Sequence, residues 1–246
     1  MRRETTNRIR FVLEDILPPV LRDSSAFHWL ARRVWGTHIT RLAEFRERAP
    51  YLTDDEYEAL YRDHPRVHQG TDNSEACIER IAKDVVGQSV CDVGCGTGFL
   101  LQRVFTARPD IKKMTGVDFV IDDVATIDNI DYVAARIEDL PFDDNTFDTV
   151  ICTHVIEHLL DYRRAIAELR RVARKRVIIV VPLEREYRYS FNPHFNFFPY
   201  THSFLRAVYP SPKVHVCEDI GRDIYYCEDL AEQTASETPT KDQPAY

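Results

Sequence analysis

Between residues 89 and 181, short runs of apolar and β-branched residues alternate with segments of helical periodicity. The runs are Ser89–Val93, Lys113–Asp118, Tyr132–Ala135, Phe147–Thr153 and Arg176–Val181. A chain that alternates strands with helices forms a parallel sheet with helices on both faces. A fully apolar run such as Val177–Val181 fits a strand that is buried on both sides. The pattern therefore predicts an α/β fold with a doubly wound sheet.

The elements on either side of this region complete the prediction. Lys213–Cys217 and Asp223–Cys227 flank Gly221 and are typical of a hairpin, which would bring the sheet to seven strands. Helices are expected over residues 8–17, 26–35, 53–61, 74–85, 99–107 and 161–173. We therefore expect a helical cap over 1–70, a core domain over 71–231 and a disordered polar tail over 232–246.

The composition excludes several classes of protein. An apolar fraction of 44% argues against wholesale disorder. The chain has no uncharged apolar run of about 18 residues, and its first residues lack the apolar segment of a signal peptide, so we expect a cytoplasmic protein without a membrane partner. A net charge of −8 argues against a general nucleic-acid binder. Six cysteines without a CxxC pair argue against a structural zinc site.

The first apolar run leads directly into the segment Asp92-Val-Gly-Cys-Gly-Thr-Gly98. Glycines at alternate positions let the backbone turn sharply and approach a ligand closely. A helix start follows, and its unpaired N–H groups can bind a carboxylate or a phosphate. A dinucleotide-binding loop would have its third glycine one residue later, where Phe99 stands. The spacing favours a ligand other than NAD, and an NAD-dependent oxidoreductase is kept as an alternative.

This segment resembles the first motif of class I S-adenosylmethionine (SAM)-dependent methyltransferases, and the resemblance extends over residues 74–230 or so. It implies that the glycine loop passes under the methionine end of SAM. Asp118 ends the second predicted strand, and the resemblance implies that it binds both ribose hydroxyls. The two acceptor oxygens of a carboxylate suit a vicinal diol. Phe119 follows Asp118 and would cover the adenine ring.

A second stretch, from Glu138 to Asp148, is similar to the corresponding segment of the ubiquinone/menaquinone-type branch, whose members act on small molecules. That branch usually has an aspartate two residues before the glutamate, where it binds the adenine amino group. Arg136 stands there and cannot accept this hydrogen bond, so the Ile137 backbone or Glu138 would take over. The implied cofactor-binding residues are Asp92, Gly94, Cys95, Gly96, Gly98, Asp118, Phe119, Ile137, Glu138 and Thr153.

Three histidines are the candidate catalytic residues. The segment after the fourth strand looks like the family's E-H-x-x-D motif and should place Thr153 and His154 beside the cofactor and the acceptor. His154 is the expected base for a hydroxyl acceptor, because histidine titrates near neutral pH. His158 follows one helical turn later, and a structural role is its alternative. His194 lies in an aromatic segment that resembles the wall of family acceptor sites, with a buried aromatic loop as the alternative.

A metal site is a further alternative at the same residues. His154, Glu157, His158 and His194 could supply ligands, and related small-RNA 2′-O-methyltransferases place glutamate and histidine ligands in a comparable region. Family members of the type that this chain resembles usually lack a metal. We therefore predict no metal, and SAM as the cofactor.

Together these features predict a SAM-dependent methyltransferase that acts on a small molecule. The hydroxyl of a sugar, a glycan precursor or a secondary metabolite is the first acceptor we expect, because the chain has no basic face for nucleic acid and has a cap instead of a peptide groove. N-methylation of a small molecule and a non-catalytic SAM-binding partner subunit are kept as alternatives. A homo-oligomer is compatible with the sequence.

Overall fold

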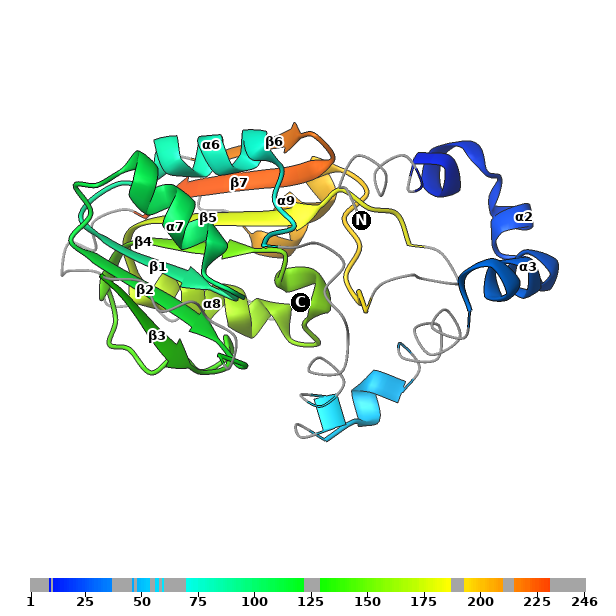
Figure 1. The fold of residues 1–246 in the computed structure, drawn as a ribbon, viewed down its shortest axis with the longest axis horizontal. Coiled ribbons are helices and arrows are strands. Elements are labelled where there is room, and N and C mark those ends of the chain that lie inside the picture. Colours follow the sequence, from blue (N-terminus) through cyan, green and yellow to red (C-terminus); the bar gives the residue numbers. More distant parts are fainter. Residues whose placement is uncertain are drawn as a thin grey trace, which may run out of the picture.

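The computed structural model describes residues 9, 11–36, 46, 48–53, 56–57, 59, 70–121, 129–186, 193–209 and 215–230. These residues form a seven-stranded sheet in the order β3-β2-β1-β4-β5-β7-β6 (Figure 1). Its strands are β1 (Ser89–Val93), β2 (Lys113–Asp118), β3 (Ile130–Ala134), β4 (Phe147–Thr153), β5 (Ala173–Pro182), β6 (His215–Ile220) and β7 (Asp223–Asp229). The described α-helices are α2 (Pro19–Arg22), α3 (Ser25–Trp35), α6 (Glu75–Asp84), α7 (Phe99–Ala107), α8 (Tyr162–Val172) and α9 (Thr201–Val208).

The predicted doubly wound sheet is confirmed. β1 pairs in parallel with β2 and β4, and β3 and β5 continue the parallel sheet on either side. β7 runs antiparallel to both β5 and β6, as the predicted hairpin requires. The limits of β1, β2 and β4 are those predicted. β5 is longer than predicted and begins at Ala173, directly after α8 ends at Val172.

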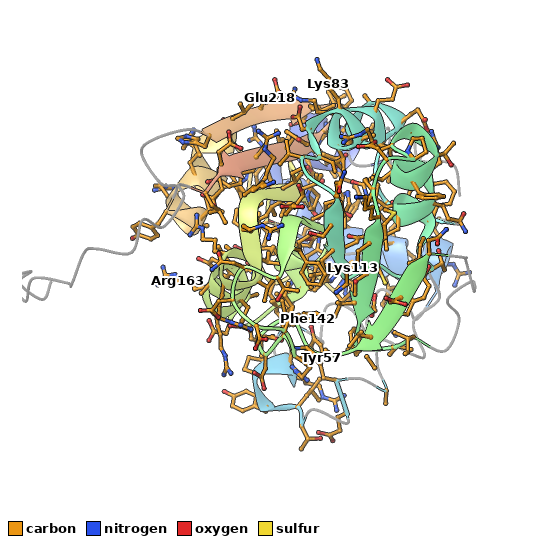
Figure 2. The ribbon with its side chains drawn as sticks, turned by 90° about the vertical axis from the view of Figure 1, so that its left-hand side faces the viewer. Tyr57, Lys83, Lys113, Phe142, Arg163 and Glu218 are labelled. Atoms are coloured by element: carbon orange, nitrogen blue, oxygen red, sulfur yellow. The ribbon has the colours of Figure 1, made fainter. Side chains whose placement is uncertain are left out.

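Helices cover both faces of the sheet because alternate strand residues point to opposite sides. Val177 and Ile179 of β5 pack into a core with α8 and α9. Ile178, between them, packs into a second core with α6 and α7. Figure 2 marks the two sides, with Arg163 on α8 and Lys83 on α6. Burial on both faces explains why this strand is apolar throughout.

Two helices of the core, α6 and α8, begin at polar side-chain caps and bury one face. The Ser74 hydroxyl accepts a hydrogen bond from the amide of Cys77, and the Asp161 carboxylate accepts one from the amide of Arg164. Each such cap stabilises its helix by about 1 kcal/mol. α8 turns a single apolar stripe toward the sheet, formed by Ala165, Ile166, Leu169 and Val172.

Other segments also differ from the sequence prediction: β3 begins at Ile130 instead of Tyr132, and β6 begins at His215 instead of Lys213. The aromatic segment that contains His194, for which a buried loop was the alternative, leads into α9, whose Phe204 and Val208 are one turn apart and buried. The first predicted helix is a π-helical turn over Val12–Ile16 and ends before Pro18. The predicted tail over 232–246 lies outside the described residues, and the 1–70 and 71–231 boundaries stay predictions.

The π-helical turn, α2 and α3 extend away from the sheet (Figure 1). Arg222, in the turn between β6 and β7, ties this region to the core through ion pairs with Glu14 and Asp15. Among the described residues, none of the helices is long and apolar enough to cross a bilayer.

Asp148 ties the amino ends of three strands together. One of its carboxylate oxygens accepts hydrogen bonds from the amides of Gln88 and Ser89, just before and at the start of β1. The other oxygen contacts Arg174 and Lys175 at the start of β5. These amides and cations hold the pKa of the buried Asp148 carboxyl well below its usual range, against the opposing effect of burial.

Asp148→Asn should therefore lower the free energy of unfolding by about 2–3 kcal/mol at neutral pH, because it weakens several charge-assisted hydrogen bonds. A depressed folded-state pKa stabilises the protein above the unfolded-state pKa of about 3.9, so the deficit should shrink as the pH falls below about 4. Urea unfolding across this pH range measures it. The control is Asp144→Asn, which removes an exposed ion pair with Arg171 and should cost about 0.5 kcal/mol or less. Equal losses in both variants would contradict the role given to Asp148.

Candidate functional site

The loop between β1 and α7 is the centre of the site. Gly94, Gly96 and Gly98 all have positive φ angles, of 81°, 56° and 79°. The amides of Gly94 and Cys95 donate to the carbonyl of Val117 at the end of β2, at 2.7 and 3.0 Å. Gly98 is the N-cap residue of α7 and has a left-handed conformation. The three glycines therefore do what their spacing predicted, since they turn the chain sharply from a strand into a helix.

Two of these glycines are also required by their neighbours. A Cβ atom on Gly94 would lie 2.1 Å from Cγ2 of Val155, and one on Gly98 would lie 2.1 Å from the Tyr132 hydroxyl. The loop after β1 is thus packed against the loop after β4 and against β3. Any larger residue at either position would have to displace one of these neighbours.

Asp118 stands at the carboxyl end of β2 and contacts the glycine loop. Its Oδ2 accepts a hydrogen bond from the amide of Gly96 at 2.8 Å, and its Oδ1 accepts one from the amide of Val120 at 3.3 Å. A carboxylate offers about four acceptor positions, so these two bonds do not exhaust it. Phe119 follows directly and is partly exposed at the same edge.

Asp92 is the buried acid of the site. It lies on β1 with 1% of its surface exposed, and its Oδ1 has no hydrogen-bond partner among the described residues. Burial, together with the negative charge of Asp118, raises the pKa of Asp92 to about 7. Cys95 is buried beside it, and burial likewise raises the pKa of this thiol.

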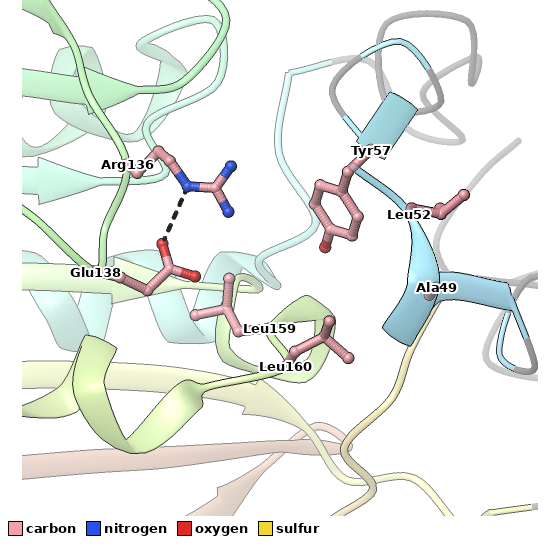
Figure 3. A pocket seen from close by; sticks show the side chains of 7 residues that line it. All are labelled: Ala49, Leu52, Tyr57, Arg136, Glu138, Leu159 and Leu160. Carbon is pink, nitrogen blue, oxygen red and sulfur yellow. Dashed lines mark ion pairs between the residues drawn. The ribbon is translucent and has the colours of Figure 1, made fainter. Parts of the chain in front are cut away.

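A pocket opens where the chain leaves β3. It is lined by Ala49, Leu52, Tyr57, Arg136, Glu138, Leu159 and Leu160 (Figure 3). Nε of Arg136 lies 3.8 Å from Oε2 of Glu138, so the two residues form an ion pair on the wall of the pocket. Ile137, between them, is buried in the core. The N-terminal segment thus meets the core at the predicted adenine-binding stretch.

Thr153, the last residue of β4, is buried and bonded to a residue that the sequence analysis did not select. The side-chain amide of Asn73 donates to the Thr153 hydroxyl at 2.9 Å. The other polar atom of Asn73, Oδ1, is buried and has no partner among the described residues. Asn73 therefore brings a second unsatisfied polar atom to the carboxyl edge of the sheet.

His154 is held between two buried carboxylates. Its Nδ1 lies 3.5 Å from Oε1 of Glu157, and its Nε2 lies 3.9 Å from Oδ1 of Asp223. Burial alone would lower the pKa of His154, but these two carboxylates raise it. The structure thus places His154 among buried carboxylates at the carboxyl edge of the sheet, and its role as a base stays a prediction.

Glu157, His158 and His194 form a compact group, which we call the polar cluster. One ligand atom of each lies within 4.8 Å of the others. The rings of His158 and His194 meet edge to face, with centroids 4.7 Å apart. Burial and the neighbouring His194 lower the pKa of His158 to about 4, which keeps its ring neutral at pH 7.

Backbone contacts fix the geometry of the polar cluster. Nδ1 of His158 lies 3.1 Å from the Pro193 carbonyl, and Nδ1 of His194 lies 2.6 Å from Oε2 of Glu184. Asn196 donates from its side chain to the carbonyls of Ile156 and Leu159 at 2.9 and 2.7 Å, clamping the 3₁₀ turn Ile156–His158. The structure thus brings together His158 and His194, which are 36 residues apart in the sequence.

Four residues that contribute to this region were not selected in the sequence analysis above: Tyr57, Asn73, Glu184 and Asp223. For two of these residues, the position relative to a strand end could have indicated a place in the site. Glu184 comes two residues after the end of β5, where a parallel strand delivers its side chains to the carboxyl edge. Asp223 begins β7, and the antiparallel register pairs it with Pro182 at that same edge. Asn73 and Tyr57 depend on how distant segments dock and had no such signal.

Comparison with known proteins shows which family this part of the chain resembles. Residues 91–181 match the profile of a family described as a methyltransferase domain. A tRNA U34 carboxymethyltransferase from Campylobacter curvus is 36% identical over 92 residues, which cover 34% of this chain and 30% of the relative. A demethylmenaquinone methyltransferase from Staphylococcus aureus is 30% identical over 112 residues, which cover 42% of this chain and 46% of the relative.

Among solved structures, a SAM-dependent methyltransferase from Aquifex aeolicus matches with a TM-score of 0.47 and 18% identity, over 70% of this chain and 97% of that chain. The chain spans less than half the length of the two curated relatives. The matched region contains the glycine loop, Asp118 and Glu157, whereas His194 lies beyond it. The predicted resemblance to SAM-dependent methyltransferases is confirmed over residues 91–181, which match a methyltransferase domain.

Proposed function

We propose that the chain transfers a methyl group from SAM to a hydroxyl group of a small-molecule acceptor such as a sugar, a glycan precursor or a secondary metabolite. The observation that carries this proposal is the glycine loop, with three positive φ angles, bonded through Gly96 to the carboxylate of Asp118. At one edge of the sheet, the glycine loop presents main-chain atoms to a ligand, and the Asp118 carboxylate presents hydrogen-bond acceptors. The family assignment sets aside the NAD-dependent alternative.

The residues present fit SAM. Gly94 and Gly98 keep the loop free of side chains, and Asp92 Oδ1 and Asn73 Oδ1 are buried polar atoms without partners among the described residues. When bound, SAM supplies an activated methyl group on a sulfonium, a good leaving group. Gly94, Cys95, Gly96 and Gly98 would hold its amino-acid end, Asp118 its ribose, and Phe119, Ile137 and Glu138 its adenine.

The protein must then align the acceptor and exclude water. The pocket between the segment of Ala49–Tyr57 and Arg136 provides a place for a small molecule beside the adenine-binding stretch. A hydroxyl acceptor also loses a proton during the transfer, and the polar cluster is the group of side chains at this edge that can compensate for that loss. The net charge of −8 opposes a phosphate backbone, which favours a small molecule over the RNA named for one relative.

Asp118→Asn should weaken SAM binding by about tenfold to a hundredfold, because a carboxylate accepts stronger hydrogen bonds from a diol than an amide does. Gly96→Arg should abolish binding. Calorimetry with S-adenosylhomocysteine measures both, and Asp131→Asn, exposed on β3, is the matched control that should bind like the wild type. Unchanged binding in Asp118→Asn and Gly96→Arg would refute the cofactor site.

Wild-type protein given SAM and a panel of hydroxyl and amine acceptors should form S-adenosylhomocysteine with a hydroxyl compound, and Asp118→Asn should lose most of this rate. Turnover of amines alone would instead support N-methylation. SAM binding without turnover of any compound in the panel would favour the non-catalytic partner subunit.

Asp92→Asn tests the buried acid. A folded-state pKa raised to about 7 means that the wild type loses stability as the pH rises from about 4 to about 7, because the unfolded chain then ionises at Asp92 while the folded protein keeps this carboxyl protonated. Asparagine does not ionise. The free energy of unfolding of the variant, relative to that of the wild type, should therefore rise by up to about 1.4 kcal/mol per pH unit in this window. Urea unfolding of the SAM-free proteins at several pH values measures this difference. If the free energies of unfolding of the variant and the wild type change in parallel with pH, the raised pKa of Asp92 is contradicted.

A further inference from the structure

We propose that the polar cluster binds one divalent transition-metal cation through the carboxylate of Glu157 and the imidazoles of His158 and His194. The inference goes beyond the methyl transfer proposed above and departs from the sequence prediction of no metal. The site is defined by geometry rather than by the family match, which ends before His194. Two histidines and one carboxylate leave coordination positions open for water or for an acceptor oxygen.

The first argument is the state of Glu157. The residue is completely buried, and neither of its carboxylate oxygens accepts a hydrogen bond from any residue that the structure describes. A buried carboxylate without such bonds costs several kcal/mol, and proteins that retain one usually pair it or use it as a ligand. Its nearest described cation is His154, whose Nδ1 is 3.5 Å from Oε1, beyond the 2.7–2.9 Å typical of a charge-assisted hydrogen bond.

The second argument is how the two histidines are oriented. In His158, Nδ1 donates to the Pro193 carbonyl, and in His194, Nδ1 donates to the Glu184 carboxylate. With Nδ1 engaged as a donor in each ring, Nε2 is the nitrogen that can bind a metal. Metal-binding histidines nearly always show this arrangement, in which the nitrogen opposite the metal donates to a carbonyl or a carboxylate. Both histidines of the cluster show it, with one partner of each kind.

The third argument is that the geometry is held in advance. The amides of Phe195 and Asn196 donate to the carbonyl of Glu157 at 2.7 and 3.0 Å, which joins the segment of His194 to the turn of Glu157 and His158. The hydroxyl of Tyr57 donates to the carbonyl of His158 at 2.7 Å. A metal ion would therefore meet three ligand atoms that already lie within 4.8 Å of one another.

The ligand types indicate the ion. Imidazole nitrogen suits Zn²⁺ and its first-row neighbours, whereas Mg²⁺ prefers oxygen ligands only. His154, which the sequence suggested as a fourth ligand, is not part of the group within 4.8 Å. If the proposed methyl transfer is correct, a cation here would lower the pKa of an acceptor hydroxyl bound to it and replace a base.

In the test, the 246-residue chain is stripped of metal with a chelator and titrated with Zn²⁺ alone by calorimetry. The wild type should bind one Zn²⁺ per chain and should show no comparable binding of Mg²⁺. Glu157→Gln and His194→Asn should each weaken Zn²⁺ binding at least about 100-fold. His202→Ala, on a ring stacked against Tyr200 outside the cluster, and Cys217→Ser, at a partly exposed thiol, should bind like the wild type.

A second measurement separates loss of the site from loss of folding. Without metal, the unfolding temperature of Glu157→Gln should be no lower than that of the wild type, because the substitution removes a buried charge. Addition of Zn²⁺ should raise the unfolding temperature of the wild type and leave that of Glu157→Gln unchanged. The visible spectrum of Co²⁺ should report nitrogen and oxygen ligands. Failure of the wild type to bind Zn²⁺ stoichiometrically, or equal binding by Glu157→Gln and His194→Asn, would overturn the proposal. SAM binding by the metal-free protein tests the proposed function separately.

Discussion

The position of β1 between β2 and β4 is the constraint on which the site depends. The chain moves from β1 to β2 and β3 on one side and returns to β4 and β5 on the other, so the order of strands reverses between β1 and β4. The loops that follow these two strands leave in different directions, and ligands of open α/β sheets bind in the crevice between them. Here the loops touch, since Gly94 has no room for a Cβ beside Val155. The glycine loop, Asp118 and the polar cluster all lie at this edge.

Several buried acidic residues lie at this carboxyl edge of the sheet. Burying them lowers the stability of the fold. Asp92, Glu157, Glu184 and Asp223 are all at least 99% buried. The opposite edge also has a buried acid, Asp148, but there amides, an arginine and a lysine surround the carboxylate. The contrast separates two uses of the same residue type. Asp148 joins three strands, whereas Asp92 and Glu157 keep oxygens without hydrogen bonds from described residues, as binding sites often do.

The sequence could predict those parts of the fold that depend on local patterns. The limits of β1, β2 and β4 follow from apolar runs that are bounded by turn residues. The helix caps at Ser74 and Asp161 follow from side chains that bond to the next turn. α9 was missed because its first residues continue an aromatic stretch, and its helical face only becomes apparent from the burial of Phe204 and Val208. The role of Asp148 was missed because its partners belong to other strands.

For the candidate site, the sequence by itself determined the half to which we assign SAM binding. Gly94, Gly96 and Gly98 and the carboxylate of Asp118 act through local backbone geometry and through the end of a strand, and both can be read from spacing. The other half, the polar cluster, was decided only by the tertiary structure. His158 meets His194, and Glu184 orients His194, because the segment after β5 folds back over the turn after β4 and is held there by Asn196. No local pattern encodes that contact, since it depends on the docking of two loops that are distant along the chain.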